Sequence, residues 1–259
     1  MPRRPGSLPK AVACRRSPSL CHALRLIVYR MVDAVLVEFE GVLADTRAAR
    51  RAALLDTLAE DGITLSDSEY RDRCAAMPVR AALRAAYSTR HVSADDTGVE
   101  LAAVRAEKRF ARAVQSGLSL TSGARAFIEA AQTQTRLGIV SRAARGDIEL
   151  TLSLAQLEHA FEFIIADDDA FAPKPSPASY HGAVERLKRR RSVNARNVIA
   201  LEDGAAGIHA ARGAGLRCAV VGALPVHVAV DADGMIPSLI GQTVATLDVV
   251  TLGHRAAER

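Results

Sequence analysis

Glu38 and Glu40 lie at the end of a mostly apolar run at residues 33–38 and stand directly before Gly41. Such a run predicts a buried strand, in which alternate residues share one face. We therefore expect both glutamates to point beyond the carboxyl end of this strand, where open α/β sheets bind their ligands. Two carboxylates at such a place can divide the work between a nucleophile and a carrier of protons.

Three later apolar runs, at 137–140, 163–166 and 198–201, also lead to polar side chains. Ser141 and Arg142 follow the first, where a hydroxyl and backbone amides can bind phosphate. Lys174 lies between two prolines, which restrict its backbone, after the second. Glu202 and Asp203 follow the third, and such a pair of hard oxygen donors suits Mg²⁺.

The four positions together fit the hydrolysis of a phosphate monoester. A carboxylate that attacks an anionic phosphate needs a divalent cation and a lysine to neutralise the crowded negative charge. The attacking carboxylate forms an acyl-phosphate, which splits one difficult step into two. The second carboxylate then protonates the leaving oxygen and later activates water.

Each position has an ordinary structural explanation when taken alone. An acidic residue after a strand is commonly a solvated loop residue, and Ser141 can cap the helix that follows it. The stretch 202–204 can be a turn that opens a helix. The function is therefore predicted from the conjunction of the four positions, each after its own apolar run.

These segments resemble the four motifs of the haloacid dehalogenase-like hydrolases. The motif sequences are most similar to those of the branch that contains phosphoglycolate phosphatases and β-phosphoglucomutases, above all at 201–215 and at 172–177. In the family's first motif both catalytic residues are aspartates, whereas this chain has Glu38 and Glu40. The resemblance covers about residues 31–245.

The resemblance implies a role for each site residue. Glu38 would be the nucleophile, and Glu40 the acid and base, which also offers its backbone carbonyl to the metal. The implied Mg²⁺ ligands are Glu38, Glu40, Glu202 and Asp203. Ser141 and Lys174 would hold the phosphate, Lys174 would also take part in catalysis, and further candidates for binding the substrate are Arg142, Arg50 and Arg80.

Two departures from the pattern bear on activity. Glutamate retains the charge of aspartate but moves the carboxylate by about 1–1.5 Å, and such a misplacement can cost on the order of 10²-fold in rate. Arg50 stands where the mutases have a histidine, and an arginine cannot shuttle protons at neutral pH.

We therefore expect a slow Mg²⁺-dependent phosphatase; the alternative is a catalytically disabled relative that binds phosphate, a sugar phosphate or a protein partner. A carbon–halogen hydrolase would have little use for Glu202 and Asp203.

The order of elements predicts an α/β fold, a doubly wound parallel sheet with a small helical cap inserted after its first strand. We assign residues 31–46 and 115–259 to the core, 47–114 to the cap, and 1–30 to a basic, disordered extension. A further apolar run at 218–221 brings the expected strands to five or more, and helices are expected in the core at about 122–133, 145–158, 176–191 and 205–214. In the cap, Ser66 and Glu69 have the spacing of a capping box, which predicts the start of a helix. The cap is placed to close over the two glutamates.

Composition narrows the possible functions. The 259 residues carry a formal charge of +5, but residues 1–30 contain seven basic residues and no acidic one, which leaves 27 basic and 29 acidic residues elsewhere. With few aromatic residues as well, we expect no nucleic-acid partner.

Four scattered cysteines favour a reducing cytoplasm, and the absence of a long apolar run predicts a soluble protein without membrane contact. The expected partner is a small phosphorylated metabolite, and the protein is expected to be a monomer or a homodimer.

Overall fold

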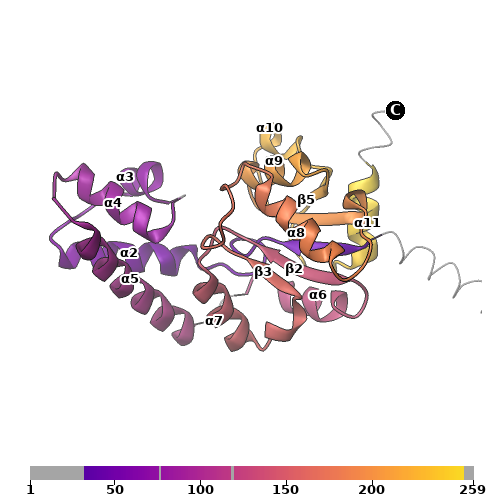
Figure 1. Cartoon of the computed structure of the whole chain (residues 1–259), viewed down its shortest axis with the longest axis horizontal. Coiled ribbons are helices and arrows are strands. Elements are labelled where there is room, and N and C mark those ends of the chain that lie inside the picture. Colours follow the sequence, from indigo (N-terminus) through magenta and orange to yellow (C-terminus); the bar gives the residue numbers. More distant parts are fainter. Residues whose placement is uncertain (1–31, 76, 118–119, 254–259) are drawn as a thin grey trace, which may run out of the picture.

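A parallel sheet forms the larger of two parts of the molecule (Figure 1). The computed structural model describes residues 32–75, 77–117 and 120–253. The six strands are hydrogen-bonded in the order β3-β2-β1-β4-β5-β6. Their bounds are Ala34–Val37 (β1), Arg136–Val140 (β2), Phe163–Ile165 (β3), Val198–Glu202 (β4), Arg217–Val221 (β5) and Gly234–Ile236 (β6). All five pairings are parallel, so the carboxyl ends of the strands lie at one edge.

Helices cover both faces of the sheet, because alternate residues of its strands are apolar on either side. In β1, Val35 and Val37 pack into one hydrophobic cluster, and Ala34 and Leu36 into the other. The first cluster includes residues of three helices, α6 (Ala124–Ala131), α7 (Arg145–Ala155) and α11 (Val244–Gly253). The second includes residues of α8 (Ala178–Lys188) and α9 (Ala205–Gly213).

The doubly wound α/β class is therefore confirmed, with two additions to the expected elements. Strand β6 and helix α11, which pack against each other, were not predicted from the sequence. The remaining short helices are η1 (Glu158–Ala160), η2 (Ala195–Asn197) and α10 (Val226–Ala229).

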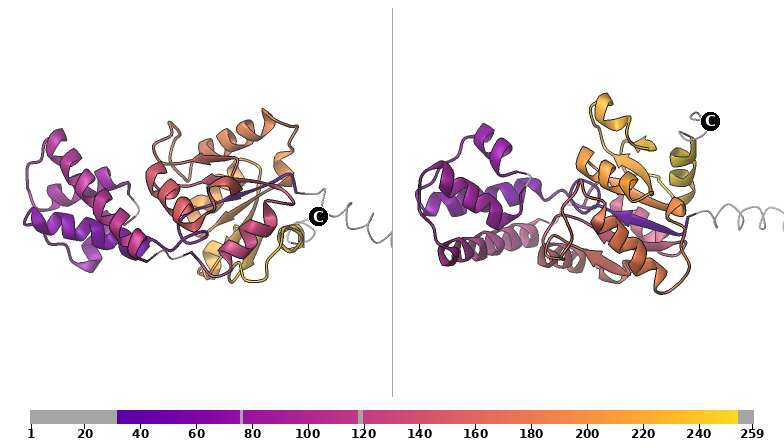
Figure 2. Two further views of the ribbon diagram at one scale, coloured as in Figure 1. Left: turned by 90° about the horizontal axis from the view of Figure 1, so that it is seen from below. Right: turned by 45° about the horizontal axis from the view of Figure 1, so that its top comes forward.

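Four helices between β1 and α6 form a separate part at one end of the core (Figure 2). They are α2 (Arg47–Glu60), α3 (Asp67–Arg73), α4 (Val79–Thr89) and α5 (Asp96–Ser116), and we call them the cap. Their apolar faces enclose a hydrophobic cluster of their own, which includes Leu58, Leu83 and Val99. The capping box expected from the sequence opens α3, where Ser66 and Glu69 each accept from the other's backbone amide.

Two segments that join the cap to the core lie side by side. Ala44, before α2, forms an antiparallel bridge with Leu120, which lies after α5. The amide of Thr121 donates to the carbonyl of Leu43 at 3.0 Å. The chain thus leaves the core and returns to it at one place.

The extension predicted for residues 1–30 lies outside the described residues. None of the helices in the described part of the chain has the length and apolarity needed to cross a membrane.

Candidate active site

Glu38 is buried at the carboxyl end of β1, and both of its carboxylate oxygens are hydrogen-bonded. Oε1 accepts from the backbone amide of Phe39 at 2.8 Å and from the hydroxyl of Ser141. Oε2 accepts from Nζ of Lys174 at 2.6 Å. Three donors therefore fix the direction of this carboxylate. Glu38, Ser141 and Lys174, which the sequence predicted as site residues, lie in direct contact.

Lys174 is buried and links Glu38 to Glu202. Its Nζ donates to Glu202 Oε1 at 2.6 Å and to the carbonyl of Val140 at 2.8 Å, which uses all three ammonium hydrogens. Burial disfavours the ammonium, but the attraction of Glu202 and Glu38 outweighs it and raises the pKa of Lys174. The lysine is thus held in its charged form between two carboxylates.

Glu202 has a second partner that was not predicted from the sequence. The hydroxyl of Tyr180, on α8, donates to Glu202 Oε1, and the Tyr180 ring lies 5.0 Å from Nζ of Lys174. Burial is the largest influence on Glu202 and raises its pKa to about 7, while Lys174 acts in the opposite direction. A Cβ added at Gly207, on α9, would overlap the Glu202 carboxylate, so glycine is required for this close approach. We call Glu38, Lys174, Glu202 and Tyr180 the buried floor.

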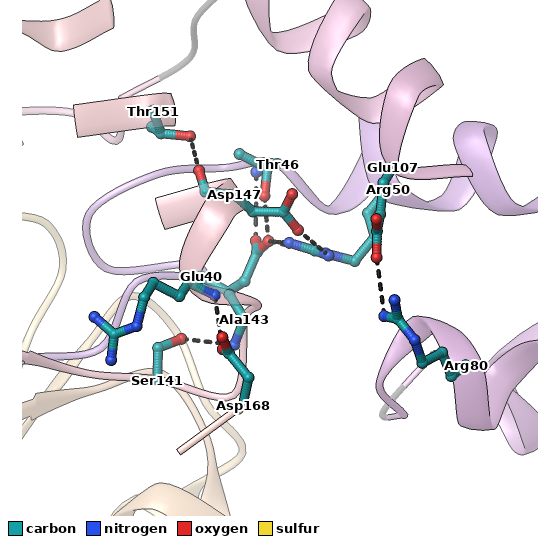
Figure 3. Close-up of polar contacts among 11 residues, drawn as sticks. Glu40, Thr46, Arg50, Arg80, Glu107, Ser141, Ala143, Asp147, Thr151 and Asp168 are labelled. Atoms are coloured by element: carbon teal, nitrogen blue, oxygen red, sulfur yellow. Dashed lines mark hydrogen bonds and ion pairs between the residues drawn. The ribbon is translucent and has the colours of Figure 1, made fainter. Parts of the chain in front are cut away.

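Glu40 lies nearer the cap and has different partners (Figure 3). Its Oε1 accepts from the hydroxyl of Thr46 and, at 3.4 Å, from both Nε and Nη2 of Arg50. Arg50 belongs to α2 of the cap, and its Nη1 donates at 2.8 Å to Asp147 on α7 of the core. Burial raises the pKa of Asp147, and Arg50 lowers it in part. Asp147 has no counterpart among the predicted site residues.

Asp203 faces Arg47, the first residue of α2, across the turn at Gly41. Nη2 of Arg47 donates to Asp203 Oδ2 at 3.0 Å, and 62% of the arginine side chain is exposed. Gly41 has a φ of +77°, and a Cβ there would overlap both partners. Burial, followed by the charge of Glu38, raises the pKa of the Asp203 carboxyl.

A cavity of about 1100 Å³ lies between the cap and the core and is lined by Glu38, Glu40 and Asp203. Its charged residues are divided by sign. The cap contributes mostly cations, namely Arg47, Arg50, Arg51, Arg80 and Lys108, with Glu107. The core contributes mostly anions, namely Glu38, Glu40, Asp147, Asp167, Asp168 and Asp203, with Arg142. The cavity therefore offers a positive wall opposite a negative one.

The predicted arginines occupy distinct places. Arg142 lines the cavity beside Ser141, and its charge lowers the pKa of Asp203 in part. Arg80, on α4, also lines the cavity, but its guanidinium bonds Glu100 at 2.6 and 2.8 Å and Glu107 at 2.9 Å, both on α5. Arg80 therefore ties two cap helices together at the wall of the cavity.

The carboxylates that could hold Mg²⁺ are dispersed among these partners. In the described part of the chain, no group of three or more His, Cys, Asp or Glu side chains is arranged to hold a metal ion. Glu38 and Asp203 both line the cavity, and their charges repel each other. Because a cation between them would relieve that repulsion, this pair fits Mg²⁺. Glu202 is engaged by Lys174 and Tyr180, so the full set of four ligands stays a prediction.

A family model for haloacid dehalogenase-like hydrolases matches residues 35–221, a range that spans all four strand ends described above. The chain belongs to the haloacid dehalogenase-like hydrolase family. Protein CbbY of Cereibacter sphaeroides is 31% identical to this hydrolase over 200 residues, which cover 73% of this chain and 84% of CbbY. The resemblance seen in the motifs is therefore confirmed, and so is the expectation of an enzyme of this class.

Solved structures extend the likeness to three dimensions. The crystal structure of CbbY from Rhodobacter sphaeroides in complex with phosphate has a TM-score of 0.72 and 26% identity, and the match covers 84% of this hydrolase and 99% of that chain. A variant of the same protein was solved in complex with xylulose-1,5-bisphosphate, with a TM-score of 0.71. A β-phosphoglucomutase from Clostridium difficile shares the fold, with a TM-score of 0.73 at 17% identity, covering 87% of this chain and 99% of that one.

Proposed function

We propose that this hydrolase is a Mg²⁺-dependent phosphatase that acts on a small phosphorylated metabolite through a carboxylate nucleophile. The observation that carries the proposal is the environment of Glu38. Its carboxylate lies at the inner end of the cavity and is oriented by Ser141 and Lys174, the two residues that the family resemblance assigns to the phosphate.

The chain's own residues account for each step. Glu38 attacks phosphorus and forms an acyl-phosphate while the bond to the leaving oxygen breaks. Glu40 donates a proton to that oxygen and then takes one from the water that hydrolyses the acyl-phosphate. Lys174 and Ser141 orient Glu38, and the ammonium of Lys174 neutralises part of the charge. Mg²⁺ held by Glu38 and Asp203, with the backbone carbonyl of Glu40, would supply the remaining positive charge at the phosphate.

The division of charge in the cavity favours a substrate with a second anionic group. Such a group would face Lys108 and Arg51, whose guanidinium also pairs with the exposed Asp67, while the reacting phosphate lies at the core wall. The complex of a CbbY variant with xylulose-1,5-bisphosphate supports this class of substrate. We therefore propose a sugar phosphate that carries two anionic groups, and expect a higher kcat/KM for xylulose-1,5-bisphosphate than for xylulose 5-phosphate. Equal values would contradict this choice of substrate.

The test of hydrolysis uses the full chain with a panel of phosphorylated metabolites in Mg²⁺. We expect slow release of phosphate that Glu38→Gln abolishes, because the amide cannot act as the nucleophile. The paired change Glu38→Asp with Glu40→Asp is expected to accelerate release on the order of 10²-fold, since each carboxylate then moves by one methylene. Equal release by the wild-type protein and Glu38→Gln would overturn the proposal.

A disabled protein that binds phosphate is the second candidate, and one contact favours it. The ammonium of Lys174 is saturated by Glu38, Glu202 and a carbonyl, so phosphate would have to displace a partner. If no substrate in the panel is hydrolysed, calorimetric titration with inorganic phosphate in Mg²⁺ decides the matter. Binding without turnover, together with hydrolysis by the paired aspartate variant, would establish this second function.

A further inference from the structure

Arg50 is a cap residue whose charged group lies among groups of the core. It belongs to α2, yet its guanidinium bonds Glu40, in the loop after β1, and Asp147, in the first turn of α7 (Figure 3). A second cap helix covers it, since the Phe110 ring of α5 lies 4.7 Å from the guanidinium carbon. Arg50 therefore joins two segments of the core to α2 and α5 of the cap.

The distances show which contact anchors the side chain. The bond from Arg50 to Asp147 is 2.8 Å, whereas both bonds to Glu40 are 3.4 Å. Asp147 is the more enclosed carboxylate, with 13% of its side chain exposed against 21% for Glu40. Asp147 thus holds the guanidinium, which then makes the longer bonds to Glu40.

The charges around the Arg50 guanidinium show why its bonds to Glu40 and Asp147 affect the position of the cap. Two carboxylates, Glu40 and Asp147, share one guanidinium, and Asp168 adds a further negative charge near Asp147. An arginine stays charged at every physiological pH, so the attraction is permanent. Without it, two largely buried carboxylates would lose their shared counter-charge, and burial of an uncompensated carboxylate is unfavourable.

We propose that Arg50 is a positioning residue that holds the cap against the core and sets the direction of the Glu40 carboxylate. The sequence predicted Arg50 as a group that binds the substrate, but its donors are engaged by Glu40 and Asp147. Because these bonds join α2 of the cap to Glu40 and Asp147 of the core, Glu40 is fully oriented only when the cap lies against the core. The effect on turnover rests on the proposed function, whereas the effect on the cap does not.

Hydrogen exchange on the full chain, without Mg²⁺ or substrate, tests the position of the cap. Arg50→Met retains the packing on Phe110 but removes the charge, and we expect about tenfold faster exchange in the second half of α5 and the first turns of α7, because charged hydrogen bonds are lost. Arg84→Met is the matched control, since Arg84 bonds Asp96 within the cap. Unchanged exchange in Arg50→Met, or the same increase in Arg84→Met, would overturn the proposal.

A third variant separates charge from simple loss of packing. Adding Asp147→Asn to Arg50→Met removes one of the two uncompensated carboxylates, so we expect exchange to return part of the way to the wild-type rate. Arg50→Lys keeps the charge and should also restore part of the protection. If the double variant exchanges faster than Arg50→Met, the residue acts by packing alone and the proposal fails.

Kinetics then test the orientation of Glu40. On a hydrolysed substrate we expect Arg50→Met to lower kcat about tenfold with little change in KM, and Arg50→Lys to recover part of kcat. A rise in KM with unchanged kcat would show instead that Arg50 binds the substrate, and would contradict the positioning role. Absence of hydrolysis in every variant would disprove the proposed function, while the exchange measurements still decide the position of the cap.

Discussion

The buried floor and the region beneath the cap use the same kinds of charged group in opposite ways. In the floor, Lys174, Glu38 and Glu202 have side chains that are only 2–7% exposed and are joined at 2.6 Å. Beneath the cap, the bond of Arg47 to Asp203 is 3.0 Å and that of Arg50 to Glu40 is 3.4 Å, in side chains that are 21–62% exposed. The floor is therefore fixed before a ligand arrives, whereas beneath the cap the exposed pair of Arg47 and Asp203 can exchange partners and Arg50 is held mainly by Asp147, at 2.8 Å.

The largest expected effect comes from breaking the floor at its cation. Lys174→Met leaves Glu38 and Glu202 buried without their shared partner, and we expect it to lower the free energy of unfolding by about 3–5 kcal/mol. Urea unfolding at pH 7 measures this loss. Adding Glu202→Gln should recover part of it, because one uncompensated carboxylate is removed. A loss below about 1 kcal/mol for Lys174→Met would show that the floor is no more constrained than the region beneath the cap.

A smaller effect is expected from crowding the floor. Gly207→Ala places a methyl group against the Glu202 carboxylate, and we expect a loss of about 1–3 kcal/mol in urea unfolding. The matched control is Gly146→Ala in α7, where an added Cβ meets open space. That change should be neutral or stabilise the protein by up to about 1 kcal/mol. Equal losses in the two variants would mean that the approach to Glu202 is not the constraint.

The smallest effect is expected beneath the cap, at the exposed pair of Arg47 and Asp203. We expect Arg47→Gln to lower the free energy of unfolding by less than about 1 kcal/mol, because solvent screens the pair. The difference from wild type should shrink further in unfolding experiments at about 1 M salt. A loss comparable to that of Lys174→Met would remove the contrast between the two regions.

The sequence allowed prediction of those parts of the fold that follow from local patterns. The short apolar runs, separated by helical patterns, indicated five strands, and the pair Ser66 and Glu69 marked the start of α3. Strand β6 was missed because it has only three residues and contains Gly234. Helix α11 was missed because its sequence, VATLDVVTLG, is rich in β-branched residues, which favour strands in isolation.

The site was predictable where residues lie at strand ends and not where they come from helix faces. Glu38, Ser141 and Lys174 meet because parallel strands end at one edge of the sheet. Tyr180 and Asp147 lie within helices, and nothing in their neighbours marks them as polar partners of distant groups. Their contacts depend on the rotation of α8 and α7 about their axes, which tertiary packing determines.

The paired segments at Ala44 and Leu120 have a consequence for how such a protein can change its specificity. Because the chain leaves and re-enters the core at adjacent points, residues 47–116 form an insertion whose two ends already lie together. None of the described residues in this range pairs with the sheet, so the strand register does not depend on them. Insertions whose ends meet at the surface are well tolerated by folded domains. A different helical module could therefore be transplanted onto the same pair of stems and bring a new choice of substrate to an unaltered set of reacting groups.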